Sequence, residues 1–253
     1  MFFFAGAVCL VCSIFVASSA VALKPKQDAN KIVDRQKKVL SVAGLVRAGE
    51  ELGPELVAKR FEENIVTKVI NVETGEYVSD IDAASYDMRK AAADPATSVA
   101  APEGNAAKVM RVPNHALVYQ VVRDGKVDNL ILPVHGKGLW STLYGFLAVE
   151  SDAQTVSGIV FYEHAETPGL GGEVDNPRWR STWKGRKVYG DDGQPKISVI
   201  KGAAGSASAD PYHVDGLSGA TITSRGVSYL VQFWMGDDGF KPYLDRFKAQ
   251  GGA

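Results

Sequence analysis

Ten residues near the C-terminal end combine hydroxyl side chains with glycines directly before a helical pattern. Residues 215–224 read Asp-Gly-Leu-Ser-Gly-Ala-Thr-Ile-Thr-Ser, with four hydroxyls and two glycines. The apolar residues Val227, Leu230, Val231 and Trp234 follow at the i, i+3, i+4, i+7 spacing of one helix face. Serine and threonine before such a face are N-cap residues, so we expect these hydroxyls where a helix begins.

The beginning of a helix suits a phosphate group. Its first N–H groups have no partner within the helix and carry a partial positive charge, and glycine lets the backbone approach an anion closely. An ordinary capped turn explains the same residues, because Ser/Thr/Gly turns before helices are common. The residues alone therefore leave a phosphate site and a capped turn both open.

Two further segments have the residue types that a flat ring ligand needs. Residues 138–141 (Gly-Leu-Trp-Ser) lead into a predicted strand, and residues 164–172 (His-Ala-Glu-Thr-Pro-Gly-Leu-Gly-Gly) follow another. Pro168-Gly169 is a turn signal, and glycine-rich turns expose backbone hydrogen-bonding groups. Apolar side chains would cover the faces of the ring and backbone groups would bind its edge. A plain turn with a core Trp140 is the alternative, and the spacing alone favours it.

The motif Asp-Gly-Leu-Ser-Gly-Ala-Thr resembles the flavinylation motif of membrane-bound flavoproteins, in which FMN is attached through its phosphate to the last threonine. The chain as a whole is similar to the C subunit of the Na+-translocating NADH:quinone oxidoreductase, from the apolar N-terminal segment to Phe233-Trp234-Met235-Gly236. The resemblance implies covalent FMN on Thr221, and we assign no residue to a metal. It implies further cofactor-binding residues: Ser218, Gly219, Ala220, Asp215, Thr223, Trp140, Leu139, Glu166, Thr167, Gly169, Leu170, Gly171 and Lys201.

Two of these assignments keep an alternative. Lys201 would place a positive charge near the flavin, or is a solvated surface lysine. His164 and Glu166 are interpreted as shaping their loop rather than as acid–base catalysts, because a flavin that accepts electrons offers them no proton to transfer.

The resemblance implies a membrane-anchored one-electron carrier. Its partners would be the other subunits of a six-subunit complex that oxidises NADH, reduces ubiquinone and pumps Na+, and a separate flavin transferase that uses FAD. The chain has no G-x-G-x-x-G element and no ionisable residue in its apolar segment, so NADH oxidation and ion conduction are expected in partner subunits. The alternatives are the G subunit of the related Rnf complex and a flavin-free, membrane-anchored assembly module.

The apolar segment Phe2–Leu23 contains no charge, and a bilayer core needs roughly 20 residues of helix. A cleaved signal peptide is the alternative, with small residues at Ala17–Ala22, but the segment lacks a basic start. We therefore predict a retained span. Within it, Cys9 and Cys12 are interpreted as packing residues, because an iron–sulfur cluster usually takes four thiolates.

The orientation of this span is ambiguous. Six basic residues follow it, namely Lys24, Lys26, Lys31, Arg35, Lys37 and Lys38, against Asp28 and Asp34. The positive-inside tendency would keep this end in the cytoplasm. The family places its large domain in the periplasm, and we follow the family: a single-pass protein of the inner membrane.

The remaining pattern predicts an α+β fold with a mostly antiparallel sheet. Helices are expected over residues 32–45, 54–63 and 86–93, the last followed by an exposed loop to Gly104, and strands over residues 65–72, 77–78, 117–122, 127–134, 143–149, 158–162 and 197–200. Asp124-Gly125 predicts a hairpin turn. His115 and His135 flank this hairpin without partners at metal-ligand spacing.

The expected units are an anchor (1–23), an N-terminal α+β part (24–134), an FMN-binding domain (135–240) and a C-terminal tail (241–253). A net charge of -1 with 23% charged residues gives no sign of a nucleic-acid partner.

Overall fold

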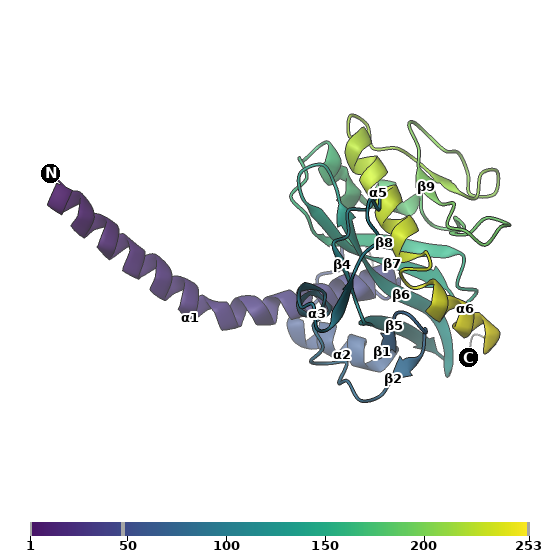
Figure 1. Cartoon of the computed structure of the whole chain (residues 1–253), viewed down its shortest axis with the longest axis horizontal. Helices are drawn as coiled ribbons and strands as arrows, with labels where there is room; N and C mark the ends of the chain where they lie inside the picture. Colours follow the sequence, from purple (N-terminus) through teal and green to yellow (C-terminus); the bar gives the residue numbers. More distant parts are fainter. Residues whose placement is uncertain (1, 47–48, 252–253) are drawn as a thin grey trace.

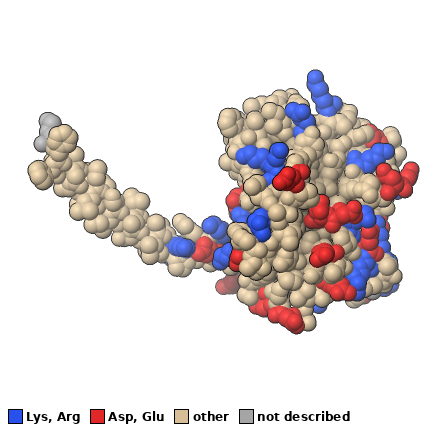
Figure 2. Space-filling view, viewed as in Figure 1, with Lys and Arg blue, Asp and Glu red and all other residues tan. Residues whose placement is uncertain are grey.

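The computed structural model of the protein describes residues 2–46 and 49–251. A single helix, α1 (Phe2–Val42), leads from the N-terminus into a folded domain (Figure 1). By length and composition α1 is able to cross a membrane, and its apolar part is exposed. Figure 2 shows no charged residue along that part. The predicted span and the helical pattern after it thus form one helix. The length and the exposed apolar surface of its first part indicate membrane anchoring.

One proline, Pro25, lies inside α1, and Figure 1 shows that this helix changes direction along its length. Proline lacks an N–H and its ring presses on the preceding turn, so a bend is expected there. Within the predicted helix over residues 32–45, Val39 and Val42 are buried, whereas Ile32 is 60% exposed because it precedes the part of α1 that reaches the domain.

The domain is built on one antiparallel sheet in the order β2-β1-β5-β6-β7-β8. Its strands are β1 (Ile65–Asn71), β2 (Tyr77–Val78), β5 (His115–Arg123), β6 (Lys126–Lys137), β7 (Thr142–Glu150) and β8 (Val156–Glu163). The predicted hairpin between β5 and β6 is confirmed, since Asp124 and Gly125 both have positive φ, 50° and 76°. The α+β class with a mostly antiparallel sheet is confirmed as well.

Both faces of this sheet are covered. Alternate residues of a strand point to opposite faces, and along β5 Leu117, Tyr119 and Val121 belong to a core shared with the end of α1 and with α2 (Pro54–Asn64). Ala116 and Val118 belong to the second core, which contains α5 (Thr221–Trp234). Gly136 of β6 lets α5 approach, because a Cβ there would lie 2.5 Å from the Cβ of Leu230.

The smaller elements complete the domain. They are α3 (Met88–Ala93), β3 (Ser98–Ala100), β4 (Arg111–Pro113), the 3-10 helix η1 (Gly171–Asp175), α4 (Pro177–Ser181), β9 (Ser198–Val199) and β10 (His213–Val214). The loop predicted up to Gly104 is wrong over β3, which pairs with β4. β9 and β10 form a separate parallel pair.

The C-terminal segment contains a helix that the sequence analysis does not predict. In α6 (Lys241–Ala249) the side chains of Tyr243, Leu244 and Phe247 are buried in the same core as α5. The boundary expected between residues 134 and 135 falls inside β6, so one sheet runs through both of the units expected there.

Candidate functional site

The hydroxyl-rich loop leads directly into α5, at the end of this helix that lies away from α6 (Figure 1). The loop is tightly built. The N–H of Gly216 donates to the carbonyl of Gly202 (2.8 Å), and Gly219 has a φ of 69°. A Cβ on Gly219 would lie 2.9 Å from the Cδ2 atom of Leu170, so this loop touches the loop that follows β8.

The beginning of α5 differs from the N-cap prediction. The N-cap residue is Ala220, and its side chain caps no backbone group. The helix begins at Thr221, directly after this N-cap residue. Thr221 and Thr223 therefore lie in its first turn instead of before it. Thr221 is exposed, whereas Thr223 and Ser224 are turned into the core, with 1% and 4% exposure.

A cleft of about 520 Å³ lies beside this helix end. Its walls are the segment after β9, the hydroxyl-rich loop and the first turns of α5, and its lining includes Lys201, Gly216, Ser218, Thr221 and Arg225. Arg225 lines this cleft although no motif in the sequence pointed to it. It follows Thr221 by four residues on a helix, a spacing that places both side chains on the same face.

Glu166 joins the other segments to α5. Its buried carboxylate accepts the N–H groups of Trp140 (2.9 Å), Ser141 (3.1 Å) and Leu139 (3.3 Å). It also accepts the hydroxyl of Thr223 at 2.6 Å. One carboxylate therefore holds together the β6–β7 loop, the loop after β8 and the first turn of α5.

The protonation state of Glu166 follows from these contacts. Burial acts to raise the pKa of the carboxyl, but the hydrogen bonds from Thr223 and the backbone N–H groups outweigh it and hold the pKa below its ordinary value. An ionised carboxylate is an acceptor only, which matches its donors. This geometry gives Glu166 a loop-positioning role, and direct contact with a flavin stays a prediction.

Glycines fit the backbone closely around this carboxylate. A Cβ on Gly171 would lie 2.6 Å from the Thr223 hydroxyl and 2.8 Å from Oε2 of Glu166. Gly171 is therefore a buried packing position. Gly169 has a φ of 76°, and the carbonyl of Thr167 accepts the N–H of Leu170 (3.1 Å), so the predicted turn is present.

Three apolar side chains of the predicted site are exposed. Leu139 is 42%, Trp140 67% and Leu170 44% exposed. The alternative of a core Trp140 is thus wrong, because its backbone N–H is held by Glu166 while its ring lies at the surface. Exposed apolar side chains on fixed loops are the kind of surface that a flat ring covers.

Asp215 has a structural contact. Its Oδ1 atom accepts the N–H of Ala204 (2.8 Å), and its carbonyl accepts the indole N–H of Trp179 (2.7 Å). It fixes the loop between β9 and β10 against the motif. His164 is in hydrogen-bonding contact with Asp175 (2.8 Å), which ties the beginning of the β8 loop to the end of η1.

The histidines and cysteines show no metal-ligand arrangement within residues 2–46 and 49–251, where no group of three His, Cys, Asp or Glu could hold an ion. His135 lies between the rings of Tyr144 and Trp234, and burial together with the charge of Arg89 lowers its pKa to about 4. Cys9 and Cys12 are free thiols on the exposed part of α1.

The fold and the site define an FMN-binding class of protein: the family of the FMN-binding domain matches residues 138–236. The C subunit of the Na(+)-translocating NADH-quinone reductase of Pseudomonas aeruginosa is 49% identical over 239 residues, which cover 94% of this chain and 91% of the relative. Its counterpart from Vibrio anguillarum is 48% identical, over 97% and 93%. The crystal structure of Shewanella oneidensis NqrC superposes with a TM-score of 0.79 at 40% identity, covering 87% of this chain and 99% of that one.

The chain belongs to the NqrC family, the C subunits of the Na(+)-translocating NADH-quinone reductase. This confirms the resemblance seen in the sequence and favours it over the G subunit of the Rnf complex.

Proposed function

We propose that the chain carries one FMN, joined through its phosphate to Thr221, and passes electrons one at a time within the Na+-pumping NADH:quinone reductase. One observation carries the proposal. Thr221 presents an exposed hydroxyl at a helix end without a side-chain cap, in a cleft that two cationic residues line. Helix N–H groups and cations are the partners that a phosphate requires.

The neighbouring hydroxyls support Thr221 as the attachment residue. Thr223 is buried and donates to Glu166, and the hydroxyl oxygen of Ser224 is buried and accepts the N–H of Leu217 (3.2 Å). A second protein cannot reach either hydroxyl in the folded chain. Ser218 is exposed in the same cleft and is the remaining rival within the motif.

The residues of the site fit the rest of FMN. Lys201 and Arg225 line the cleft beside Thr221 and would neutralise the phosphate. Leu139, Trp140 and Leu170 would cover the ring, which supplies the redox chemistry. Glu166 would hold the β6–β7 loop and the loop after β8 in position before the cofactor binds. Little ordering of these loops would then be needed on binding. We propose residues 135–240 as the flavin-binding unit.

Attachment would require a flavin transferase acting on FAD. The Thr221 oxygen forms a bond to the phosphorus of the FMN moiety, the bond from this phosphorus to the bridging oxygen breaks, AMP leaves and the hydroxyl proton is released. The exposed motif residues Thr221, Ser218 and Gly219 are accessible to such an enzyme. Because this bond is covalent, the protein would keep its flavin where no soluble flavin is available to replace it.

The remaining parts of the proposal concern the assembly. We propose that the chain is one of six subunits, that α1 anchors it in the inner membrane, and that the domain lies in the periplasm. The apolar length of α1 supports the anchor. The lysines after the span argue against this orientation, and the family argues for it.

The test is expression of the chain with an active flavin transferase, followed by denaturing electrophoresis and detection of flavin fluorescence in the band. Thr221→Ser keeps a hydroxyl and should stay fluorescent, whereas Thr221→Val should be dark. Thr74→Val, the same change at an exposed threonine outside the motif and the cleft, is the matched control and should remain labelled.

Each outcome decides between stated alternatives. Fluorescence in Thr221→Val that disappears in the double variant with Ser218→Ala would move the attachment to Ser218. A dark wild-type band, with the transferase active on another substrate, would support the flavin-free assembly module instead.

A further inference from the structure

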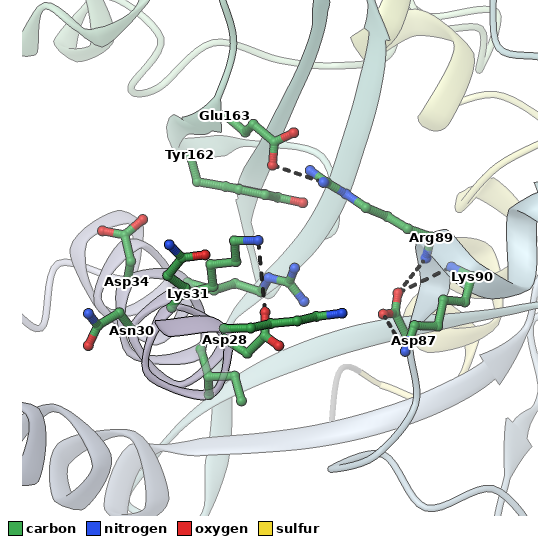
Figure 3. A pocket seen from close by; sticks show the side chains of 13 residues that line it. Asp28, Asn30, Lys31, Asp34, Asp87, Arg89, Lys90, Tyr162 and Glu163 are labelled. Carbon is green, nitrogen blue, oxygen red and sulfur yellow. Dashed lines mark hydrogen bonds and ion pairs between the residues drawn. The ribbon is translucent and has the colours of Figure 1, made fainter. Parts of the chain in front are cut away.

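Two arginines of the domain are held in different ways. Arg89 is 35% exposed; its guanidinium carbon lies 3.5 Å from the ring centroid of Tyr144, and it pairs with Glu163 at 2.8 Å (Figure 3). The cleft of about 880 Å³ around it has carboxylates beside its cations, so its charge favours no class of ligand. Arg186 is only 2% exposed, and its side chain donates to three backbone carbonyls. Because a buried charge is costly without its hydrogen bonds, this guanidinium and the backbone around it fix each other in place.

The three carbonyls that Arg186 binds belong to two separate segments. Its Nε donates to the carbonyl of Thr182 (3.0 Å), directly after α4. Its Nη2 donates to Gly205 (2.6 Å) and its Nη1 to Asp210, both in the loop between β9 and β10. A planar guanidinium can reach three acceptors at once, whereas the ammonium group of a lysine is a single point on a flexible stem. Arg186 therefore fixes the β9–β10 loop to the segment after α4.

The same part of the β9–β10 loop binds the first residue of the attachment motif. The N–H of Ala204, next to Gly205, donates to Oδ1 of Asp215 (2.8 Å). The carbonyl of Gly202 accepts the N–H of Gly216 at 2.8 Å. Arg186 thus holds one side of this short stretch, and the motif binds its other side. A shift of the loop would move the donor on which the Asp215 carboxylate depends.

Asp215 is also held directly by a residue of α4. The indole N–H of Trp179 donates to the carbonyl of Asp215 (2.7 Å), and the Trp179 side chain is buried, with 7% exposure. Residues 179–186 therefore hold Asp215 in two ways: Trp179 binds its carbonyl, and Arg186 supports the loop that binds its carboxylate. Fixing both ends of one residue fixes its backbone and its side chain together.

We propose that Trp179 and Arg186 are positioning residues for flavin attachment. They hold Asp215, and with it the loop that leads to Thr221, in the conformation that a flavin transferase recognises. The proposal rests on the proposed attachment of FMN to Thr221. Neither side chain lines the cleft beside Thr221, so both act through Asp215 and not by contact with the flavin. Positioning of this kind affects rate strongly, since a misplacement of 1 Å can cost about a hundred-fold.

The test measures how fast a flavin transferase attaches flavin from FAD to the full chain in detergent micelles, using the fluorescence of the denatured band at successive times. Trp179→Phe keeps an aromatic ring but removes the indole N–H, and Arg186→Lys keeps the charge but removes the planar group. We expect each change to lower kcat/KM for the chain as substrate roughly ten-fold. The double variant should lose less than the product of the two losses, because both residues act through Asp215.

Each variant has a matched control. Trp183→Phe makes the same change at a fully buried tryptophan of the same core, whose indole N–H has no hydrogen-bond partner among the described residues. Its ring packs against Trp179 at 5.8 Å between centroids, so it reports on packing alone. Arg89→Lys makes the same change at the arginine of Figure 3, whose ion pair and ring contacts lie outside the motif. Both controls should be labelled at the rate of the wild type.

Hydrogen exchange reports on the loop without any flavin. In Arg186→Lys the amides of residues 200–212 should exchange faster than in the wild type, while those of β6 and β7 should keep their rates. Faster exchange throughout the sheet would show a general loss of structure and would overturn the positioning role of Arg186. Slower attachment with unchanged exchange in residues 200–212 would overturn it as well.

The remaining outcomes concern attachment. Attachment at the wild-type rate in both Trp179→Phe and Arg186→Lys would overturn the proposal, and so would an equal loss in Trp183→Phe. If Arg186→Lys does not fold, as judged by thermal unfolding, the comparison of Trp179→Phe with Trp183→Phe decides. A wild-type chain that takes up no flavin would overturn the proposed function together with this proposal, whereas a labelled wild type with unaffected variants would overturn this proposal alone.

Discussion

Replacing Thr223 by valine tests the connection that organises the flavin loops. Valine has nearly the same shape as threonine but cannot donate the 2.6 Å hydrogen bond to Glu166. A hydrogen bond to a charged group contributes about 1.5–3 kcal/mol, and Glu166 keeps three backbone N–H donors. We therefore expect Thr223→Val to lower the free energy of unfolding by about 2 kcal/mol. Thr223→Ser keeps the hydroxyl and should cost about 1 kcal/mol for one buried methyl group.

The dependence of the unfolding free energy on pH distinguishes the loss of the hydrogen bond in Thr223→Val from the loss of packing in Thr223→Ser. The folded pKa of Glu166 lies below its ordinary value of 4.5, so the stability that the carboxylate contributes is complete above this value and is lost as the pH falls through the folded pKa. The difference in unfolding free energy between the wild type and Thr223→Val should therefore become smaller in acid. The difference between the wild type and Thr223→Ser comes from packing and should not change with pH.

The assay is urea unfolding of the full chain in detergent micelles, followed by tryptophan fluorescence near neutral pH and in acid. A valine variant as stable as the wild type near neutral pH would refute the reasoning. So would a gap that stays the same in acid, because the hydroxyl would then not be bonded to an ionised carboxylate.

Three further predictions concern other parts of the domain. Gly75→Ala should destabilise the protein by about 1 kcal/mol more than Gly125→Ala in urea unfolding, since both glycines have positive φ but only a Cβ at residue 75 would press on backbone, that of Pro242. Equal losses would contradict that contact. His135 is half-buried and has a pKa of about 4 in the folded state against 6.5 unfolded, so the free energy of unfolding of the wild type should fall by about 3 kcal/mol as the pH falls from 6.5 to 4. His135→Gln should flatten this slope, and an NMR titration placing the pKa of the imidazole near 6.5 would contradict it. Phe247→Ala should lower the free energy of unfolding by about 3–5 kcal/mol because α6 belongs to the core, whereas Gln250→Ala at an exposed residue should hardly change it. Two equally small losses would show that the C-terminal segment does not contribute to the core.

Local signals in the sequence predict much of this fold. Asp124-Gly125 predicts its hairpin because both residues tolerate positive φ, and Pro54 predicts the first position of α2. The strand β3 is missed because it has only three residues and pairs with β4 across a long connection. The segment of α6 is expected as a tail because it is short and follows the matched motifs, although Tyr243, Leu244 and Phe247 have helical spacing.

The candidate site is likewise predictable from the sequence only in part. Thr221 and the loop after β8 are recognisable from their motifs, and Trp140 from its place before a strand. The bond between Glu166 and Thr223 joins residues 57 positions apart, so no local pattern shows it. The exposure of Thr221 beside the buried Thr223 depends on where α5 begins, and a shift of one residue would change which hydroxyl a second protein can reach.

The way α1 ends also affects how a redox group is carried. Val39, Leu40 and Val42 pack in the core against the sheet, so no loose tether separates the anchor from the domain. A flexible linker would let the domain wander over distances that grow with the square root of its length. A helix that ends inside the core is a stiff arm, although Pro25 lies within it. Because electron tunnelling falls steeply with distance, such an arm would limit how far the redox group can move from its partners.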